Sequence, residues 1–153
     1  RIASYVGQNP RFDSVEQGAE ALWRLSSGFG PHSPQEWLAL SRPMLRALPE
    51  GGWRLHYDPA IAQAFKAMTP EVSAASAMQL WQLYDRIHAR TLLLRGAQSD
   101  LLSPETAQAM VHRGPMAKLV EFEGVGHAPT LMAQDQVQVV SEFLLAPEAT
   151  VAA

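Results

Sequence analysis

Two side chains of the sequence supply the acid and the base that nucleophilic catalysis requires. Asp100 ends the loop sequence GAQSD (96–100), and His127 ends the loop sequence EGVGH (123–127). An aspartate that holds an imidazole in one tautomer and stabilises its protonated form makes that imidazole an effective general base. Each loop directly follows a short apolar run typical of a buried strand. The sequence therefore predicts an Asp–His pair at the ends of two strands.

The elements that must position this pair form a strand–helix–strand–helix pattern. Strands are predicted at 91–95 and 118–122, with a helix between them that Ser103 caps, and a last helix follows at about 133–145. Two strands joined by a crossover helix are parallel. Their carboxyl ends then share one edge of the sheet, about 5 Å apart, so side chains there can meet. The last helix is expected to bury one apolar stripe, formed by Ala133, Val137, Val140 and Leu144.

These two loops resemble those of the α/β-hydrolases. The sequence LLLRGAQSD (92–100) is similar to the family's acid loop after the penultimate strand, and EGVGHAP (123–129) is similar to its histidine loop after the last strand. The family's chain order of nucleophile, acid and histidine agrees with Asp100 preceding His127. The resemblance implies an α/β fold, namely the C-terminal portion of an α/β-hydrolase, with Asp100 and His127 as catalytic residues.

The part of the chain before these loops is mostly helical and is punctuated by proline and glycine. Helices are predicted at 15–27, from Pro34 through Leu48 with a kink or split at Pro43, and at 74–86; a turn is predicted at 49–52 and a short strand at 53–57. In the resembling family this position holds the lid over the substrate pocket. The predicted organisation is a helical lid or cap region at 1–88, the βαβα core part at 89–146 and a tail at 147–153.

A nucleophile is missing from the pattern. The sequence contains no Gly-x-Ser-x-Gly motif and no His-Gly oxyanion segment, and in the resembling family both belong to the first half of the fold. We therefore expect the chain to be a piece of a longer hydrolase and to be inactive alone. A serine nucleophile would form an acyl-enzyme and an aspartate an alkyl-enzyme ester; the sequence leaves both open.

The amino-acid composition excludes several classes of binding partner. The net charge is −3, and no lysine or arginine cluster is present, so nucleic acid and anionic membranes are unsuitable partners. No run approaches the ~20 apolar residues of a membrane span, there is no cysteine, and a cytoplasmic location is expected. No histidine has the i, i+4 partner of a zinc helix, so neither a metal nor a cofactor is expected. The rival acid Asp85 is expected to be solvated or to be a helix-end charge.

The leading hypothesis is a cofactor-independent hydrolase that cleaves an ester, acyl or related bond. Its expected partners are a small hydrophobic substrate and the N-terminal half of the hydrolase core, and a homo-oligomer is left open. The tryptophans could line the substrate pocket or pack within the helical layer: Trp23, Trp37, Trp53 and Trp81. The alternative is a non-catalytic binding or interaction module on a hydrolase-like scaffold, since a fold does not fix a function.

Overall fold

The chain divides into two compact units. The computed structural model describes residues 7, 9–66 and 70–147; of the predicted tail 147–153, all but Pro147 lies outside the described residues. The first unit comprises Arg1–Ser27 and His32–Leu83, and the second comprises Gly28–Pro31 and Tyr84–Ala153. The second unit is therefore built from two stretches of sequence. The chain's assignment to a lid and a core stays a prediction.

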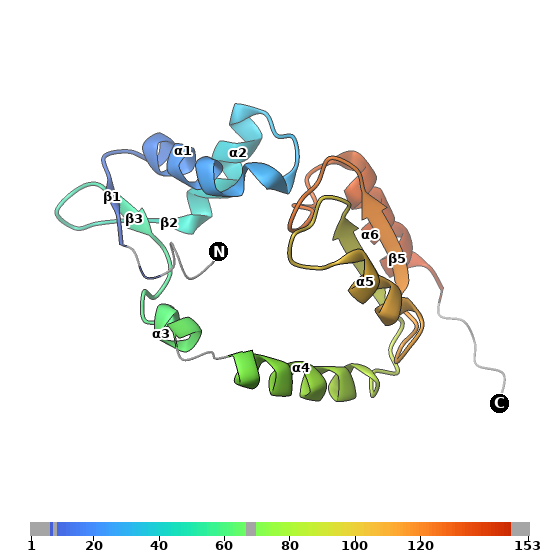
Figure 1. Cartoon of the computed structure of the whole chain (residues 1–153). Helices are drawn as coiled ribbons and strands as arrows, with labels where there is room; N and C mark the ends of the chain where they lie inside the picture. The colour runs from blue at the N-terminus through green and yellow to red at the C-terminus, as the bar shows by residue number, and fades with distance from the viewer. Residues whose placement is uncertain (1–6, 8, 67–69, 148–153) are drawn as a thin grey trace. The chain divides into compact units, whose positions relative to one another are not determined.

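The first unit combines helices with a small antiparallel sheet (Figure 1). Strand β3 lies between β1 and β2, and β2 and β3 form a hairpin. Along residues 9–84 the elements are β1 (Arg11–Phe12), α1 (Val15–Ser26), a 3₁₀ turn (Ser27–Phe29), α2 (Pro34–Ser41), a 3₁₀ turn (Arg42–Met44), β2 (Leu45–Ala47), β3 (Trp53–Leu55), α3 (Ile61–Lys66) and α4 (Pro70–Tyr84). Of the residues in these elements, Gly28, Phe29 and Tyr84 belong to the second unit.

Side-chain caps set the starts of the first two helices. The Ser14 hydroxyl accepts a hydrogen bond from the backbone N–H of Gln17 at 3.1 Å. At α2 the Ser33 hydroxyl accepts from the N–H of Glu36, while the Glu36 carboxylate accepts from the Ser33 N–H at 2.7 Å. These bonds satisfy donors that a helix leaves unpaired in its first turn. The predicted helix starts after Ser14 and at Pro34 are confirmed.

The prediction that the second helix continues to Leu48 is wrong. The helix ends at Ser41, Pro43 lies in a 3₁₀ turn, and Leu45 begins β2. Leu45 is buried because its side chain packs over Gly18, where an added Cβ would lie 2.7 Å from the Leu45 Cδ1 atom. This packing and the pairing with β3 override the local helical spacing.

The hairpin turn is confirmed. The N–H of Leu48 donates to the carbonyl of Gly52 at 2.9 Å, and Gly51 and Gly52 have φ angles of +88° and +80°. Left-handed backbone of this kind favours glycine. The predicted strand at 53–57 is confirmed for residues 53–55, and helix α4 begins before its predicted start at 74. Strand β1 was not predicted, because two residues are too few to show an alternation of apolar and polar side chains.

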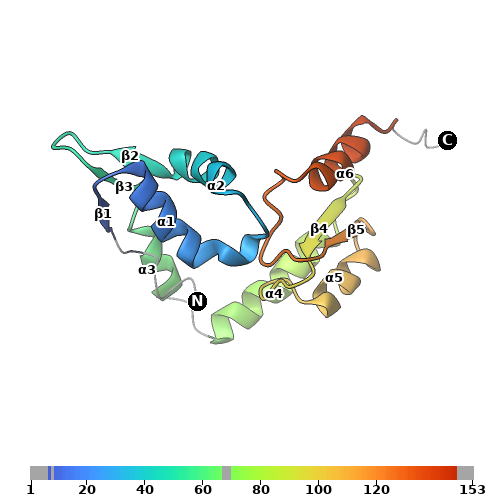
Figure 2. The ribbon, with the colours of Figure 1, turned by 90° about the horizontal axis from the view of Figure 1, so that it is seen from above.

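The second unit has the predicted strand–helix–strand–helix order. Its strands are parallel, with Leu92 opposite Lys118 and Gly96 opposite Phe122. Helices α5 and α6 lie on opposite faces of this strand pair (Figures 1 and 2). Ser103 caps α5, as predicted, by accepting from the N–H of Thr106 at 3.2 Å. The elements are β4 (Leu92–Gly96), α5 (Pro104–Val111), β5 (Lys118–Phe122) and α6 (Gln134–Leu145).

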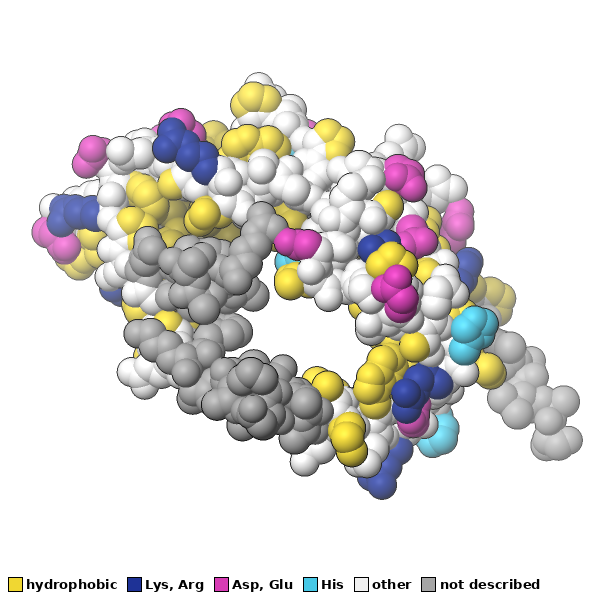
Figure 3. Space-filling view, in the orientation of Figure 1, with side chains coloured by type: hydrophobic (Ala, Val, Ile, Leu, Met, Phe, Trp, Pro, Cys, Tyr) yellow, Lys and Arg dark blue, Asp and Glu magenta, His cyan; other side chains and the backbone are white. Residues whose placement is uncertain are grey.

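Two helices present apolar side chains to the surface. The predicted buried stripe of α6 is wrong, because Val137 and Leu144 are 45% and 69% exposed, whereas the polar Gln136 is buried. Gln136 accepts a hydrogen bond from the N–H of Leu131 at 2.9 Å. Apolar side chains also reach the surface of α4 (Figure 3), namely Met78, Leu80 and Leu83. Among the described residues no helix combines the length and hydropathy of a membrane span.

Candidate active site

Asp100 and His127 lie in neighbouring loops at one edge of the second unit's sheet. Strand β4 ends at Gly96 and strand β5 at Phe122, and these two residues are paired across the strands. Both loops therefore leave the carboxyl ends of adjacent parallel strands, which is where open α/β sheets carry their reactive groups. Asp100 and His127 therefore lie in loops at the same edge of the sheet, and their catalytic roles stay a prediction. The Asp100–His127 hydrogen bond itself stays a prediction.

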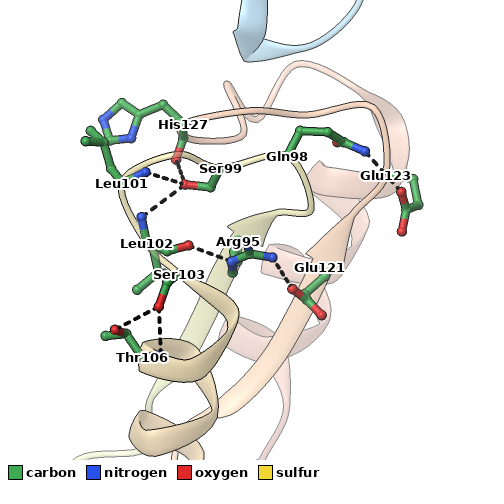
Figure 4. Close-up of polar contacts among 10 residues, drawn as sticks. All are labelled: Arg95, Gln98, Ser99, Leu101, Leu102, Ser103, Thr106, Glu121, Glu123 and His127. Atoms are coloured by element: carbon green, nitrogen blue, oxygen red, sulfur yellow. Dashed lines mark hydrogen bonds and ion pairs between the residues drawn. The ribbon is translucent and has the colours of Figure 1, made fainter. Parts of the chain in front are cut away.

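The two loops are joined by hydrogen bonds. The N–H of Ala97 donates to the carbonyl of Phe122, and the N–H of Gln98 donates to that of Val125, both at 2.9 Å. The Ser99 hydroxyl donates to the backbone carbonyl of His127 at 3.4 Å (Figure 4). These bonds start in the residues directly before Asp100, so they hold the acid loop against the histidine loop.

Ser99 has a structural position in the acid loop. Its hydroxyl oxygen accepts hydrogen bonds from the N–H groups of Leu101 and Leu102, at 3.4 and 3.1 Å. Such serine turns fix the direction of the following backbone. Because the same hydroxyl donates to His127, Ser99 bridges the two loops and orders the backbone on both sides of Asp100. Ser103 is the cap of α5. The hydroxyl groups of Ser99 and Ser103 are thus both explained by structural hydrogen bonds.

Arg95 holds the far end of the acid loop, and sequence reasoning did not single it out. Its side chain is 3% exposed. The Nε–H group donates to the carbonyl of Leu102 at 2.7 Å, and an Nη1–H group donates to the carboxylate of Glu121 (Figure 4). Burying a charge is costly unless it is paired and hydrogen-bonded, and both conditions are met here. A charged residue inside an apolar strand run was the available signal.

The histidine loop packs against residues 28–31, which follow the predicted helix at 15–27. The N–H of Gly126 donates to the carbonyl of Gly28 at 2.5 Å. The Phe29 ring lies beside the His127 imidazole, with 5.7 Å between centroids and 38° between planes. His127 itself is exposed. The imidazole thus has an aromatic neighbour that comes from far away in the sequence.

Glycines in these loops permit close backbone approach. An added Cβ at Gly96 would lie 2.1 Å from the carbonyl oxygen of Gly126, and one at Gly126 would lie 2.2 Å from that of Gly28. Gly124 has a φ of +73°. Gly124 and Gly126 therefore have different tasks. Gly124 turns the chain, while Gly126 leaves room for another segment.

The rival acid Asp85 is held in an ion pair outside these loops. It follows the end of α4 and accepts both the Nε–H group of Arg113, at 2.7 Å, and an Nη2–H group of the same side chain. This guanidinium lowers the pKa of Asp85, which burial opposes. The arrangement agrees with a helix-end charge. In the part of the chain that the structure describes, no three His, Cys, Asp or Glu side chains gather as metal ligands would.

The first unit contains a cavity of about 430 Å³ next to two of the four tryptophans. Trp23 and Trp37 meet edge to face with 4.9 Å between ring centroids, and His32 lies 5.8 Å from Trp37. The indole N–H of Trp37 donates to the carbonyl of Ala19 at 2.7 Å, which satisfies this buried group. Apolar side chains dominate the lining, while Glu16, Glu20 and Ser33 supply its polar groups.

Comparison of the structure with solved structures identifies the class. An α/β-hydrolase from Novosphingobium aromaticivorans superposes with a TM-score of 0.76 and 34% identity, over 94% of this chain and 50% of the other. E-2-(acetamidomethylene)succinate hydrolase superposes with a TM-score of 0.69 and 15% identity, over 95% and 51%, a likeness of fold alone. The chain has the fold of the C-terminal half of an α/β-hydrolase.

A sequence relative is more specific. The chain is 40% identical over 146 residues to a 3-hydroxybutyrate-oligomer hydrolase of Cupriavidus necator, and this alignment covers 94% of the chain and 50% of the relative. No family model matches the sequence. The chain spans about half the length of the relatives it matches.

Proposed function

We propose that the protein is a cofactor-independent hydrolase that cleaves ester bonds with Asp100, His127 and a nucleophile from outside these 153 residues. The observation that carries the proposal is the pair of hydrogen-bonded loops at the carboxyl ends of β4 and β5. A scaffold that fixes both loops can hold an acid and a base in one geometry, as general-base catalysis needs. The relatives named above are hydrolases, which supports the same class.

The roles of the two side chains follow from triad chemistry. With a serine nucleophile, His127 takes the hydroxyl proton as the oxygen attacks the ester carbonyl, and gives it to the leaving alcohol as the C–O bond breaks. His127 then takes a proton from water as the water oxygen attacks the acyl-enzyme, and it gives this proton to the serine oxygen as the acyl C–O bond breaks. Asp100 orients the imidazole and stabilises its protonated form. With an aspartate nucleophile, His127 acts only on the water of the second step.

The proposed substrate is a small hydrophobic ester. Oligomers of 3-hydroxybutyrate join the hydroxyl of one unit to the carboxyl of the next, so the relative's name points to ester cleavage. A short, largely aliphatic chain of this kind suits an apolar site with few polar groups.

Turnover by the full-length gene product tests the function. A 3-hydroxybutyrate trimer and p-nitrophenyl butyrate serve as substrates for the unaltered protein and for His127→Ala and Asp100→Asn. Each variant should lose roughly 10³–10⁴-fold in kcat without loss of folding, because triad members act as one unit. His88→Ala is the matched control, since His88 is exposed and lies outside both loops.

Retention of more than about a tenth of the activity by His127→Ala would contradict the triad, because loss of a general base typically costs at least 10². A folded gene product that cleaves neither ester would contradict the hydrolase itself, and would favour the binding module considered from the sequence. Circular dichroism of each variant separates lost chemistry from lost structure.

A further inference from the structure

We propose that residues 28–31 hold the histidine loop in place and that Phe29 is a positioning residue for the His127 imidazole. The proposal rests on the role of His127 as a base and adds a residue to that machinery. Phe29 precedes His127 by almost a hundred positions, and the two rings nevertheless lie 5.7 Å apart. Three contacts of the segment support the assignment, two through the backbone and one through the rings.

The first contact fixes the residue directly before His127. The N–H of Gly126 donates to the carbonyl of Gly28 at 2.5 Å. On its other side, the Gly126 carbonyl lies against Gly96 at the end of β4, where an added Cβ would come within 2.1 Å of it. Gly126 is buried between these two neighbours. Its peptide groups therefore cannot turn freely, and the Cα–Cβ direction of His127 depends on them.

The second contact fixes the residue before that. Gly30 is buried and has a φ of +110°, and an added Cβ there would lie 3.3 Å from the Cγ2 atom of Val125. Val125 is 3% exposed. Its carbonyl also accepts the N–H of Gln98 from the acid loop. Residues 28–31 thus meet the histidine loop at the backbone of Gly126 and beside the side chain of Val125, and the carbonyl of Val125 is in turn bonded to the acid loop.

The third contact acts on the imidazole itself. The Phe29 ring is tilted by 38° to the imidazole plane at a distance typical of aromatic pairs. His127 is exposed, and the Phe29 ring beside it occupies space that some rotamers of the imidazole would need. A general base must reach its proton within about 2.6–3.2 Å. Misplacement by ~1 Å can cost on the order of 10² in rate, so a ring that excludes wrong rotamers acts on kcat.

The test compares Phe29→Ala with Phe143→Ala in the full-length gene product. Phe143 is the matched control because it belongs to the same unit, is similarly part-buried, and packs under Arg90 on α6, away from both loops. We expect Phe29→Ala to lower kcat by about 10- to 100-fold with KM changed by less than about threefold. Phe143→Ala should leave kcat within about threefold, and Phe29→Tyr should restore it because the ring is kept.

A spectroscopic readout reports the contact without relying on turnover. In protein with isotopically labelled histidine, the ring-proton resonances of His127 should move in Phe29→Ala and Phe29→Leu, because the neighbouring ring current is lost. They should stay in place in Phe143→Ala, with His88 and His112 as internal references. The backbone part is tested by Gly126→Ala against Gly28→Ala. Only an added Cβ at Gly126 meets another atom within 4 Å, so only that variant should shift the His127 resonances.

The outcomes separate this proposal from the function on which it rests. If His127→Ala abolishes turnover while Phe29→Ala keeps kcat within about threefold, the positioning role is wrong and the hydrolase stands. If Phe29→Ala does not fold, Phe29→Leu takes its place, and an unmoved His127 resonance in Phe29→Leu overturns the contact. If His127→Ala keeps its activity, the catalytic function fails first, and the positioning role fails with it.

Discussion

Arg95, near the end of β4, stabilises the acid loop, although its residue type alone does not indicate this role. Arg95 sits in an apolar strand, yet its guanidinium is the group that ties the carbonyl of Leu102 to Glu121. Glu121 is 42% exposed while Arg95 is nearly fully buried, so the pair is enclosed on one side only. The arginine therefore depends on both hydrogen bonds to offset its burial. It anchors the loop that carries Asp100 at the end facing α5.

Replacing Arg95 should accordingly destabilise the protein. Arg95→Met removes both hydrogen bonds and leaves the Leu102 carbonyl without this donor, so the free energy of unfolding should fall by about 2–4 kcal/mol. Arg46→Met is the control, because Arg46 is exposed on β2 and should change it by less than about 0.5 kcal/mol. Urea unfolding measures both. Equal losses in the two variants would show that Arg95 is no special anchor.

At this scale the sequence predicts Asp100 and His127 as the acid and the base, and this assignment stays a prediction; the residues that support their loops were not predicted. Asp100 and His127 lie in loops that follow two parallel strands, which bring such loops to one edge of the sheet. Phe29 contributes through a long-range contact with the histidine loop, which no local pattern encodes. The glycines around it favoured a turn, and the sequence could not show that Gly30 also makes room for Val125.

Among the elements, α2 has the most completely satisfied start. Ser33 and Glu36 form a reciprocal capping box, and the hydroxyl of Ser33 also donates to the Glu36 carboxylate at 2.8 Å. The backbone N–H of Ser33, then its hydroxyl, lower the pKa of Glu36 below its ordinary value of 4.5, which burial partly opposes. The helix that carries Trp37 therefore depends on a charged carboxylate at its first turn.

Ser33→Ala should loosen this start in a pH-dependent way. Loss of the cap typically lowers the free energy of unfolding by about 1 kcal/mol, and Ser33→Thr should keep most of it. Because the folded pKa of Glu36 is lowered, its contribution is present above pH 4.5 and is lost as pH falls through the lowered value. In Ser33→Ala the pKa should move upward, and an NMR titration of the Glu36 carboxyl carbon measures it. An unmoved pKa would show that the hydroxyl does not matter.

The elements were predictable to different extents in the two units. The 118–122 strand and the helix that Ser103 caps were predicted closely, because local patterns and short connections define them. In the first unit the segment after Ser41 was predicted as helix, and it is a 3₁₀ turn followed by strand β2. Strand β2 pairs with β3 in a hairpin, and Leu45 packs over Gly18, which is distant in sequence.

On the scale of the whole molecule, residues 1–153 alone should not cleave esters. Their sequence holds no nucleophile motif, and a general base without a nucleophile leaves the chemistry incomplete. We expect a purified polypeptide of these residues to release no p-nitrophenol above the background rate. Turnover that disappears in His127→Ala would contradict this, since it would show a complete site within the chain. Equal turnover in both would indicate a contaminant.

Of the large-scale features, the fold was predicted from the sequence, whereas the burial of the last helix was not. The two loop sequences were sufficient to predict the α/β-hydrolase fold, because they resemble the acid loop and the histidine loop of that family. Burial was harder, since a helical stripe predicts a buried face without naming its neighbour, and Val137 and Leu144 of α6 are exposed. The comparisons align the chain with only half of a hydrolase. Burial patterns in the sequence therefore need not be satisfied by these residues themselves.

The short stretch 28–31 also governs how proteins of this kind can be recombined. The backbone passes between the two units at 27/28, at 31/32 and at 83/84. No single cut can therefore separate them, and residues 84–153 taken alone lack the carbonyl that Gly126 uses. A chimera that takes segments 9–27 and 32–83 from a relative must keep Gly28–Pro31 from the chain that supplies β4 and β5. If residues 9–83 were exchanged as one continuous block, the relative's own residues would replace 28–31 beside His127.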